Sequence, residues 1–179
     1  MTRALPALAF ACVAMAVRGE DCRTVDAARG IVSFELKQAG APFRGNFKRF
    51  GGEVCLDGDR ITRIDVWLEP GSVDAGLPEI DKALLDKDFF AVAQFPRALY
   101  SAKSAEQKGD VQVSHGTLRM KGKSRSFDVP LSVKREGSQR VISGTAALNR
   151  LDYGIGTGEW SNTQWLGAEV TLSFRVGIP

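Results

Sequence analysis

The chain has 179 residues, enough for one domain with a substantial core. Hydrophobic residues make up 44% of the sequence and charged residues 25%, a balance that excludes a disordered or fibrous protein. The formal net charge is +3, and Lys and Arg are scattered among Asp and Glu rather than gathered in a basic stripe, so a nucleic-acid partner is not expected.

The first residues have the features of a secretory signal peptide. Arg3 supplies a positive charge, the apolar run ALPALAFACVAMA follows, and Ala14-Met15-Ala16 fits the small-x-small cleavage rule. The run is shorter than the about 20 residues of a membrane-spanning helix. An uncleaved membrane anchor is the alternative, and lipidation of Cys12 stays open. The sequence therefore predicts an export signal over residues 1-16 and a mature domain over residues 22-179.

Removal of the signal peptide would leave two cysteines, Cys22 and Cys55. An even pair of cysteines is readily bridged in an oxidising compartment, and this bond would tie the mature N-terminus to an early strand. Two buried free thiols are the alternative. Because His115 is the single histidine and the sequence has no CxxC or HxxxH motif, no metal site is expected.

Most of the mature sequence alternates between apolar and polar residues with a period of two, which is typical of half-buried strands. In IVSFELK, for example, Val32, Phe34 and Leu36 share one face. The same pattern recurs in GNFKRF, GGEVCLD, ITRIDVWLEP, RALYSAK, VQVSHGTLRMKG, SFDVPLSVK, RVISGTAALN and AEVTLSFRV. Glycine-containing turns separate these segments, so the pattern predicts an antiparallel sandwich or barrel.

One segment, LPEIDKALLDKDFF, has helical features instead. Pro78 suits a first helical turn, and Glu79 and Asp81 suit the positive end of the helix dipole. We expect one short helix from about Pro78 to Asp86, which either covers one end of a barrel or fills part of the core.

The segment LDYGIGTGEW carries three glycines at alternate positions. A dinucleotide-binding turn needs GxGxxG between a strand and a helix, but here the third glycine comes one residue early and a strand pattern follows. Nucleotide binding is therefore disfavoured, and we expect the glycines to bend or bulge a strand. Trp160 and Trp165 then lie in a loop near a barrel mouth, where they cover a ligand or pack as core.

Four segments in matching order and spacing resemble the YceI family of exported, lipocalin-like, polyisoprenoid-binding proteins. They are FRGNFKRFGGEV, SVDAG with LLDKDFFAVAQFP, GTLRMKGKSRSFDVPL, and LNRLDYGIG followed by GEW. Lys121 departs from the family pattern, because many members have histidine there. We expect Asn149, Arg150 and Asp152, in the last segment, to fix a bend through hydrogen bonds and a charge pair.

The resemblance implies an all-β fold, an eight-stranded antiparallel lipocalin-like barrel with one short helix inserted between strands. It also implies that the protein is located in the periplasm. It also implies an elongated apolar cavity that holds an isoprenoid chain, either a polyprenyl chain or the tail of an isoprenoid quinone. The ligand-binding residues expected in the lumen are Phe34, Phe47, Val66, Leu68, Phe89, Phe90, Tyr100, Leu131 and Phe174. Those expected at the mouth are Leu84, Leu85, Trp160 and Trp165.

Two other functions stay open from the sequence. An enzyme could use mouth carboxylates for acid–base chemistry, although no catalytic residue is assigned; the candidates are Asp81, Asp86, Asp88, Asp152 and Glu159. A solid-cored interaction domain is the other alternative. We expect no cofactor beyond a bound isoprenoid lipid or quinone and no metal, and the sequence leaves open a homodimer and transient contacts with a membrane or membrane redox proteins.

Overall fold

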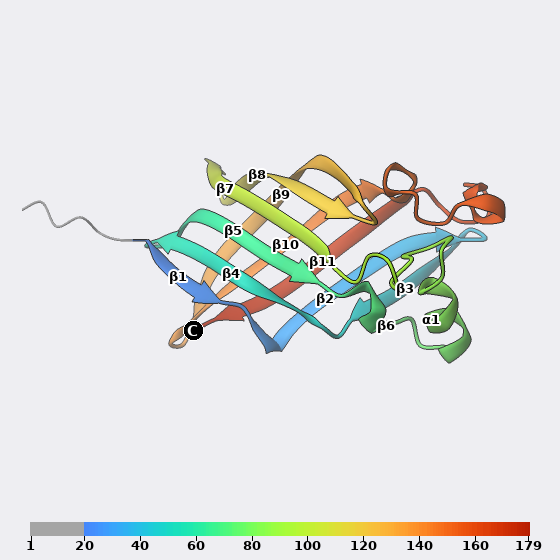
Figure 1. Ribbon diagram of the computed structural model, residues 1–179. Coiled ribbons are helices and arrows are strands. Elements are labelled where there is room, and N and C mark those ends of the chain that lie inside the picture. Colours follow the sequence, from blue (N-terminus) through green and yellow to red (C-terminus); the bar gives the residue numbers. More distant parts are fainter. Residues whose placement is uncertain (1–19) are drawn as a thin grey trace, which may run out of the picture.

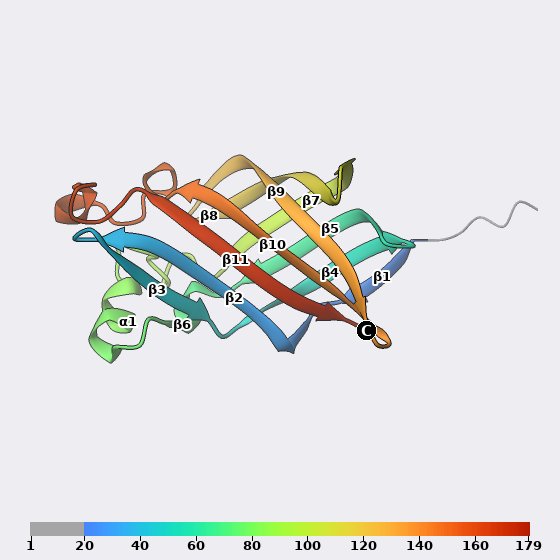
Figure 2. The same cartoon turned by 180° about the vertical axis from the view of Figure 1, so that it is seen from behind.

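The computed structural model describes residues 20–179. In this part of the chain one antiparallel sheet curls around a central space (Figures 1 and 2), with strand order β1-β4-β5-β7-β8-β9-β10-β11-β2-β3-β6. The strands are β1 (Asp21–Thr24), β2 (Asp26–Gln38), β3 (Ala41–Phe47), β4 (Phe50–Asp57), β5 (Arg60–Leu68), β6 (Val73–Asp74), β7 (Ala98–Lys108), β8 (Val111–Met120), β9 (Lys123–Glu136), β10 (Gln139–Asn149) and β11 (Glu169–Ile178). The helical elements are α1 (Pro78–Leu84) and the 3-10 turns η1 (Pro70–Ser72), η2 (Arg150–Tyr153) and η3 (Gly158–Ser161).

The predicted all-β, lipocalin-like class is confirmed, with a correction to the strand number. The nine long strands correspond to the nine alternating segments of the sequence. Strands β1 and β6, of four and two residues, are additions at the two ends of the strand order. The described sheet therefore has eleven strands rather than eight. Its strand order is linear, so the first and last strands of the order, β1 and β6, are not paired with each other.

Helix α1 begins at Pro78 as predicted, and Glu79 and Asp81 lie in its first turn. It ends at Leu84, two residues before the predicted end. The next amides donate to nearer carbonyls, as when the N–H of Leu85 bonds the carbonyl of Lys82, and this tightens the chain into turns. In residues 20–179 no helix has the length and apolar character needed to cross a membrane. The predicted signal peptide, with Cys12, lies outside the described residues.

The ladder between β9 and β10 covers only part of their length. Pairing runs from Gln139 opposite Glu136 to Gly144 opposite Leu131 and then stops. The next residue of β9 is Pro130, which has no N–H to donate to a ladder. Beyond this point β9 remains paired with β8, and β10 with β11. A seam without ladder bonds therefore separates the β8–β9 hairpin from β10 over the second half of β10.

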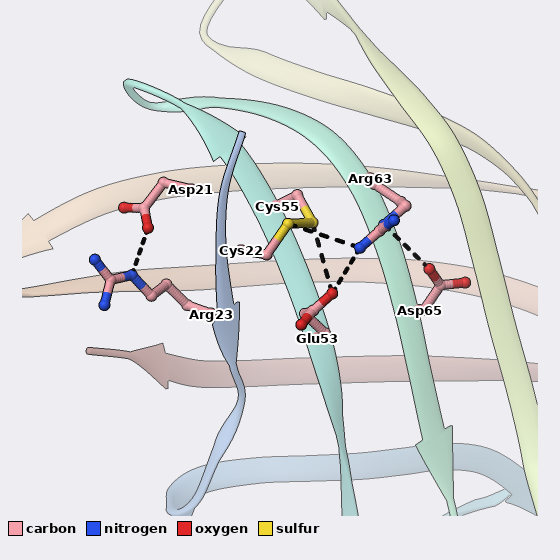
Figure 3. Close-up of a disulfide and its surroundings, with 7 residues drawn as sticks. All are labelled: Asp21, Cys22, Arg23, Glu53, Cys55, Arg63 and Asp65. Carbon is pink, nitrogen blue, oxygen red and sulfur yellow. Dashed lines mark hydrogen bonds and ion pairs between the residues drawn. A yellow bond between two sulfur atoms is a disulfide. The ribbon is translucent and has the colours of Figure 1, made fainter. Parts of the chain in front are cut away.

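A disulfide joins the first strand to the sheet. Cys22 of β1 lies directly opposite Cys55 of β4, with 3.9 Å between their Cα atoms. Figure 3 shows Arg63 of β5 beside this bond: its guanidinium donates to Glu53 at 2.6 Å and lies 3.7 Å from the Cys22 sulfur. The side chain of Cys55 is fully buried. The N-terminus of the described chain is thus fixed to the sheet by a covalent bond and by the β1–β4 ladder.

We expect the double variant Cys22→Ala/Cys55→Ala to unfold at lower urea concentration than the native protein. The bond spans 33 residues of sequence, so loop entropy predicts a loss of about 3–4 kcal/mol in the free energy of unfolding. Reductant should destabilise the native protein to a similar extent and leave the variant unchanged. Equal unfolding midpoints for the native protein and the variant would contradict this expectation.

Candidate functional site

The curled sheet surrounds a cavity of about 390 Å³, a volume within the range of about 300–1,000 Å³ that is usual for small-molecule sites. Its walls are the inward-facing residues of the long strands, and α1 and the loops at one end of the barrel complete it. Nearly all the lining side chains are aliphatic or aromatic. An apolar, concave site of this kind suits an apolar ligand.

Most of the residues predicted from the sequence to bind a ligand line this cavity. They are Phe34, Phe47, Val66, Leu68, Leu84, Phe89, Phe90, Tyr100, Leu131, Trp160 and Phe174. Leu85 and Trp165 do not line it. Leu85 follows the last residue of α1 and packs against the core at the mouth, while the side chain of Trp165 is 53% exposed. Neither residue lies in a strand with alternating apolar and polar residues, so its side-chain direction could not be predicted from alternation.

The cavity has further lining residues that were not among the predicted ligand-binding residues. Among them are Val32, Leu36, Phe50, Val54, Ile64, Leu118, Phe127, Val129, Ile142, Ala146, Leu148, Val170, Leu172 and Val176. Most share a strand face with a predicted residue, as Val32 and Leu36 do with Phe34. Alternation predicts the inward face of these strands, but it does not show which of the inward residues border an open space.

The one tyrosine in the cavity wall has its hydroxyl bonded to protein. The hydroxyl oxygen of Tyr100 lies 2.7 Å from the hydroxyl oxygen of Ser114. It also lies 3.3 Å from the carbonyl oxygen of Phe127, which can accept its proton. Gly116 makes room for it, because a Cβ there would lie 2.5 Å from the Tyr100 hydroxyl. Burial raises the pKa of Tyr100, so the group stays neutral at ordinary pH. The middle of the cavity therefore carries no charge from this residue.

Arg150 organises the loops at one end of the cavity. Its side chain is only 2% exposed. Its five N–H groups donate to five carbonyl oxygens at 2.7–2.9 Å, and these belong to Ile155, Gly156, Trp160, Leu166 and Gly167. Burial lowers the pKa of Arg150, but guanidinium is basic enough to remain charged. One side chain thus satisfies carbonyls spread along the whole 155–167 segment.

This arrangement corrects the prediction of a charge pair between Arg150 and Asp152, since every donor of Arg150 is used by a backbone carbonyl. The hydrogen-bonding role predicted for Asn149 is present, because its side-chain oxygen accepts the N–H of Leu151 at 2.9 Å. A charge pair between near neighbours was plausible from sequence alone. The buried carbonyls of the loop, which are invisible in the sequence, compete for the same donors.

The three glycines of this segment also differ from the prediction of a bent or bulged strand. All three have positive φ, between 64° and 70°, and they connect the 3-10 turns η2 and η3. Gly156 has a second constraint, because a Cβ at this position would collide with the Arg150 guanidinium. The segment reaches back to the α1 side of the mouth, where the N–H groups of Gly156 and Thr157 donate to the Asp88 carbonyl at 2.7 and 3.0 Å.

Lys121, the residue that departs from the family pattern, joins the same two loops. Its ammonium donates to the carbonyls of Lys87 and Gly154, both at 2.6 Å. It lies in the β8–β9 turn with φ of 48°, and burial lowers its pKa. Three segments that are distant in sequence therefore meet at the mouth through Lys121 and Asp88.

The carboxylates considered for acid–base chemistry do not face the cavity. Asp81 accepts the N–H of Ala75 at 2.6 Å, and Asp88 lies 3.4 Å from the hydroxyl of Thr157. Asp86, Asp152 and Glu159 are also outside the lining. Within residues 20–179 the only carboxylate residue that contributes to the lining is Glu79, so the described part of the cavity holds no carboxylate pair.

Comparisons with known proteins agree on one family. The model of the YceI-like domain matches residues 24–178. A UPF0312 protein of Pseudomonas syringae pv. tomato is 27% identical over 151 residues, which cover 79% of this chain and 78% of that protein. The crystal structure of Burkholderia cenocepacia BcnA is similar with a TM-score of 0.82 and 28% identity, covering 86% of this chain and 98% of BcnA. A polyisoprenoid binding domain from Saccharophagus degradans shares the fold, with a TM-score of 0.68 and 15% identity over 87% of this chain and 96% of that domain.

The constraint at Gly156 predicts a difference between two glycine substitutions. Gly156→Ala and Gly158→Ala both place alanine at positive φ, which costs about 1–2 kcal/mol, but a Cβ at Gly158 has open space. We expect Gly156→Ala to lower the free energy of unfolding by at least about 1.5 kcal/mol more, because it displaces a charged hydrogen-bond donor. Urea unfolding of both variants measures this difference, and equal losses would show that Arg150 does not constrain Gly156.

Proposed function

The chain belongs to the family of YceI-like domains, and from this membership and its cavity we propose that it is a lipid-binding protein that holds an isoprenoid chain inside the barrel. The ligand is a polyprenyl chain or the tail of an isoprenoid quinone. The protein acts as a carrier and not as an enzyme.

The observation that carries this proposal is the cavity of about 390 Å³, whose lining is apolar apart from Gln38, Glu79 and Arg150 at one end. Each methylene that moves from water into such a space contributes about 0.8 kcal/mol. A hydrocarbon tail therefore binds without any charged contact. The same space argues against a solid-cored interaction domain, because a core of that kind would be filled by its own side chains.

The related structures support the proposal without deciding the ligand. The domain from Saccharophagus degradans is described as polyisoprenoid binding, and its fold matches this chain over most of both lengths. The polar residues of the cavity wall argue against catalysis. Tyr100 has its hydroxyl engaged by Ser114, and Arg150 has all its donors engaged by carbonyls, so neither side chain is free to act on a substrate.

We further propose that the protein is exported to the periplasm and works there after loss of its signal peptide. The bond between Cys22 and Cys55 supports this location, because disulfides persist in oxidising compartments. The carrier would then meet membranes, the source of isoprenoid lipids, through transient contacts. N-terminal sequencing of the protein recovered from the periplasm tests this part of the proposal, and an intact Met1 in the cytoplasm would contradict it.

Native mass spectrometry of the protein purified from its own periplasm tests ligand identity. We expect a co-purifying mass that fragments as a prenyl lipid or quinone. Purification of a ligand-free protein that also fails to take up added prenyl lipids would contradict the proposal.

A large side chain in the cavity should block the tail. Val66→Trp and Leu131→Trp each add an indole to the lining, and we expect prenyl-lipid affinity to fall at least tenfold in both. Overpacking costs about 1–3 kcal/mol, so circular dichroism must show that the variants fold. Ser101→Trp, on the exposed face of β7, is the matched control and should bind normally. Unchanged binding in both folded lumen variants would mean that the lipid does not occupy this cavity.

A further inference from the structure

The cavity is open at one end and closed at the other by packed side chains. On β4, β5 and β11 the inward-facing residues nearest the closed end are Leu56, Ile61 and Ile178, with exposures of 0%, 1% and 0%. None of the three lines the cavity, whereas the next inward residues toward the mouth do; these are Val54, Ile64 and Val176. All six belong to one packed cluster. We call Leu56, Ile61 and Ile178 the floor.

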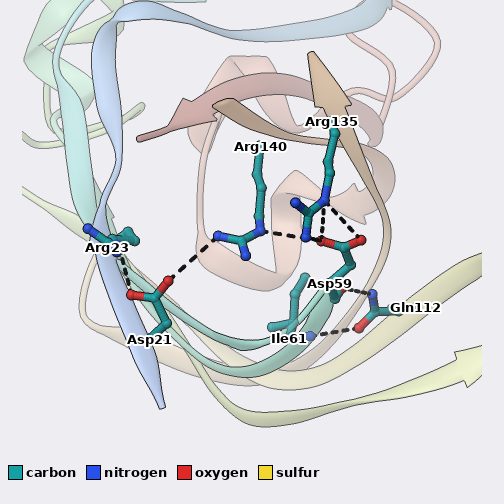
Figure 4. A network of polar contacts seen from close by, with 7 residues as sticks. All are labelled: Asp21, Arg23, Asp59, Ile61, Gln112, Arg135 and Arg140. Atoms are coloured by element: carbon teal, nitrogen blue, oxygen red, sulfur yellow. Dashed lines mark hydrogen bonds and ion pairs between the residues drawn. The ribbon is translucent and has the colours of Figure 1, made fainter. Parts of the chain in front are cut away.

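Polar contacts hold the β4–β5 turn over the outside of the floor, as Figure 4 shows. The carboxylate of Asp59 accepts from Arg135 of β9 at 3.1 Å and from Arg140 of β10 at 3.3 Å. Gln112 of β8, which is buried, donates to the Asp59 carbonyl at 2.7 Å and accepts the N–H of Ile61 at 2.8 Å. The turn is therefore fixed to β8, β9 and β10, three strands to which β4 and β5 are not paired.

An ion pair also connects this end of the barrel to β1, the first strand of the described chain. Arg140 also lies 3.6 Å from Asp21 of β1, the strand that the disulfide fixes to β4. The surface ion pairs contribute little one by one, but Gln112 is a buried side chain that bonds two backbone groups of the turn region. The closed end thus consists of the packed apolar floor on the inside and of the β4–β5 turn, held by polar contacts, on the outside.

The opposite end has the character of an entrance. The polar side chains that contribute to the lining, Gln38, Glu79 and Arg150, belong to the end of β2, to α1 and to the 150–167 segment, and these gather at the same end in Figures 1 and 2. A linear molecule with one polar end must therefore enter with its apolar end first, and the floor is the first obstacle that it meets.

From this geometry we infer that the floor measures the ligand: Leu56, Ile61 and Ile178 set the longest isoprenoid tail that the cavity encloses, and the protein selects isoprenoids by length. The inference rests on the proposed function, because it requires an isoprenoid in the cavity. Each methylene buried above the floor raises affinity about fourfold. Once the tail reaches the floor, each further unit stays outside the mouth in water and adds nothing.

Two substitutions should shift this limit in opposite directions. Ile61→Ala removes part of the floor and should extend the limit to a longer tail. Ala102→Leu adds bulk on β7 and should shorten the limit. Ala102 is the next inward residue after Tyr100, is 4% exposed and belongs to the same packed cluster as the floor. Ile31→Ala and Ala147→Leu make the same chemical changes at exposed positions and should leave the limit where it is. Ile178→Val is a milder floor variant to use if Ile61→Ala does not fold.

The measurement is displacement of a fluorescent apolar dye by linear all-trans prenyl alcohols of increasing length, with folding of each variant checked by circular dichroism. For the native protein we expect affinity to rise with each isoprene unit up to one length and then to level off. The length at which it levels off should be about one unit shorter in Ala102→Leu and longer in Ile61→Ala or Ile178→Val.

The outcomes separate the two proposals. If no alcohol of any length displaces the dye from the native protein or binds in a direct titration, the proposed function is wrong. If the alcohols bind but affinity rises without limit, or levels off at the same length in all folded floor variants, the inference about the floor is wrong while the proposed function stands.

Discussion

The open end of this barrel depends on the hydrogen bonds of one buried side chain. The 155–167 segment has little ladder of its own, and its inward carbonyls need donors that strands cannot supply. Arg150 supplies five in a planar fork. Lysine offers only three donors from a single nitrogen. These bonds fix a segment that has almost no strand pairing, and they hold Trp160 and Leu166 where they line the cavity.

The sequence predicted the parts of the structure that follow a period. Alternation located the nine long strands and oriented Phe34, Val66 and Phe174 inward, and Pro78 marked the start of the helix. Predictions were less successful where no period exists. The directions of Leu85 and Trp165, the turns at the three glycines and the partners of Arg150 are all set by tertiary contacts. Strands β1 and β6 were missed because each is short and forms only through its neighbour.

An unfilled interior lowers stability, because the side chains around it lose contacts that a packed core would give. The described structure offsets this loss at the edges of the cavity. The disulfide, the Gln112 bonds and the floor lie at one end, and the Lys121 and Arg150 bonds lie at the other. The wall between these ends, which has to accept a ligand, is mostly apolar, and Tyr100 there has its hydroxyl bonded to Ser114 rather than exposed to the ligand.

The seam at Pro130 has a consequence for the shape of molecules that this barrel can accommodate. Between β9 and the second half of β10 no ladder bonds fix the spacing of the strands, while each strand stays paired on its other side. The two sides can therefore move apart along this seam without breaking a ladder bond, although Lys121 and Arg125 bond the β8–β9 hairpin to the segment after β10 at the mouth. A chain with methyl branches is thicker than a straight one, and a wall that lacks ladder bonds along one seam resists such a chain less than a fully paired wall would.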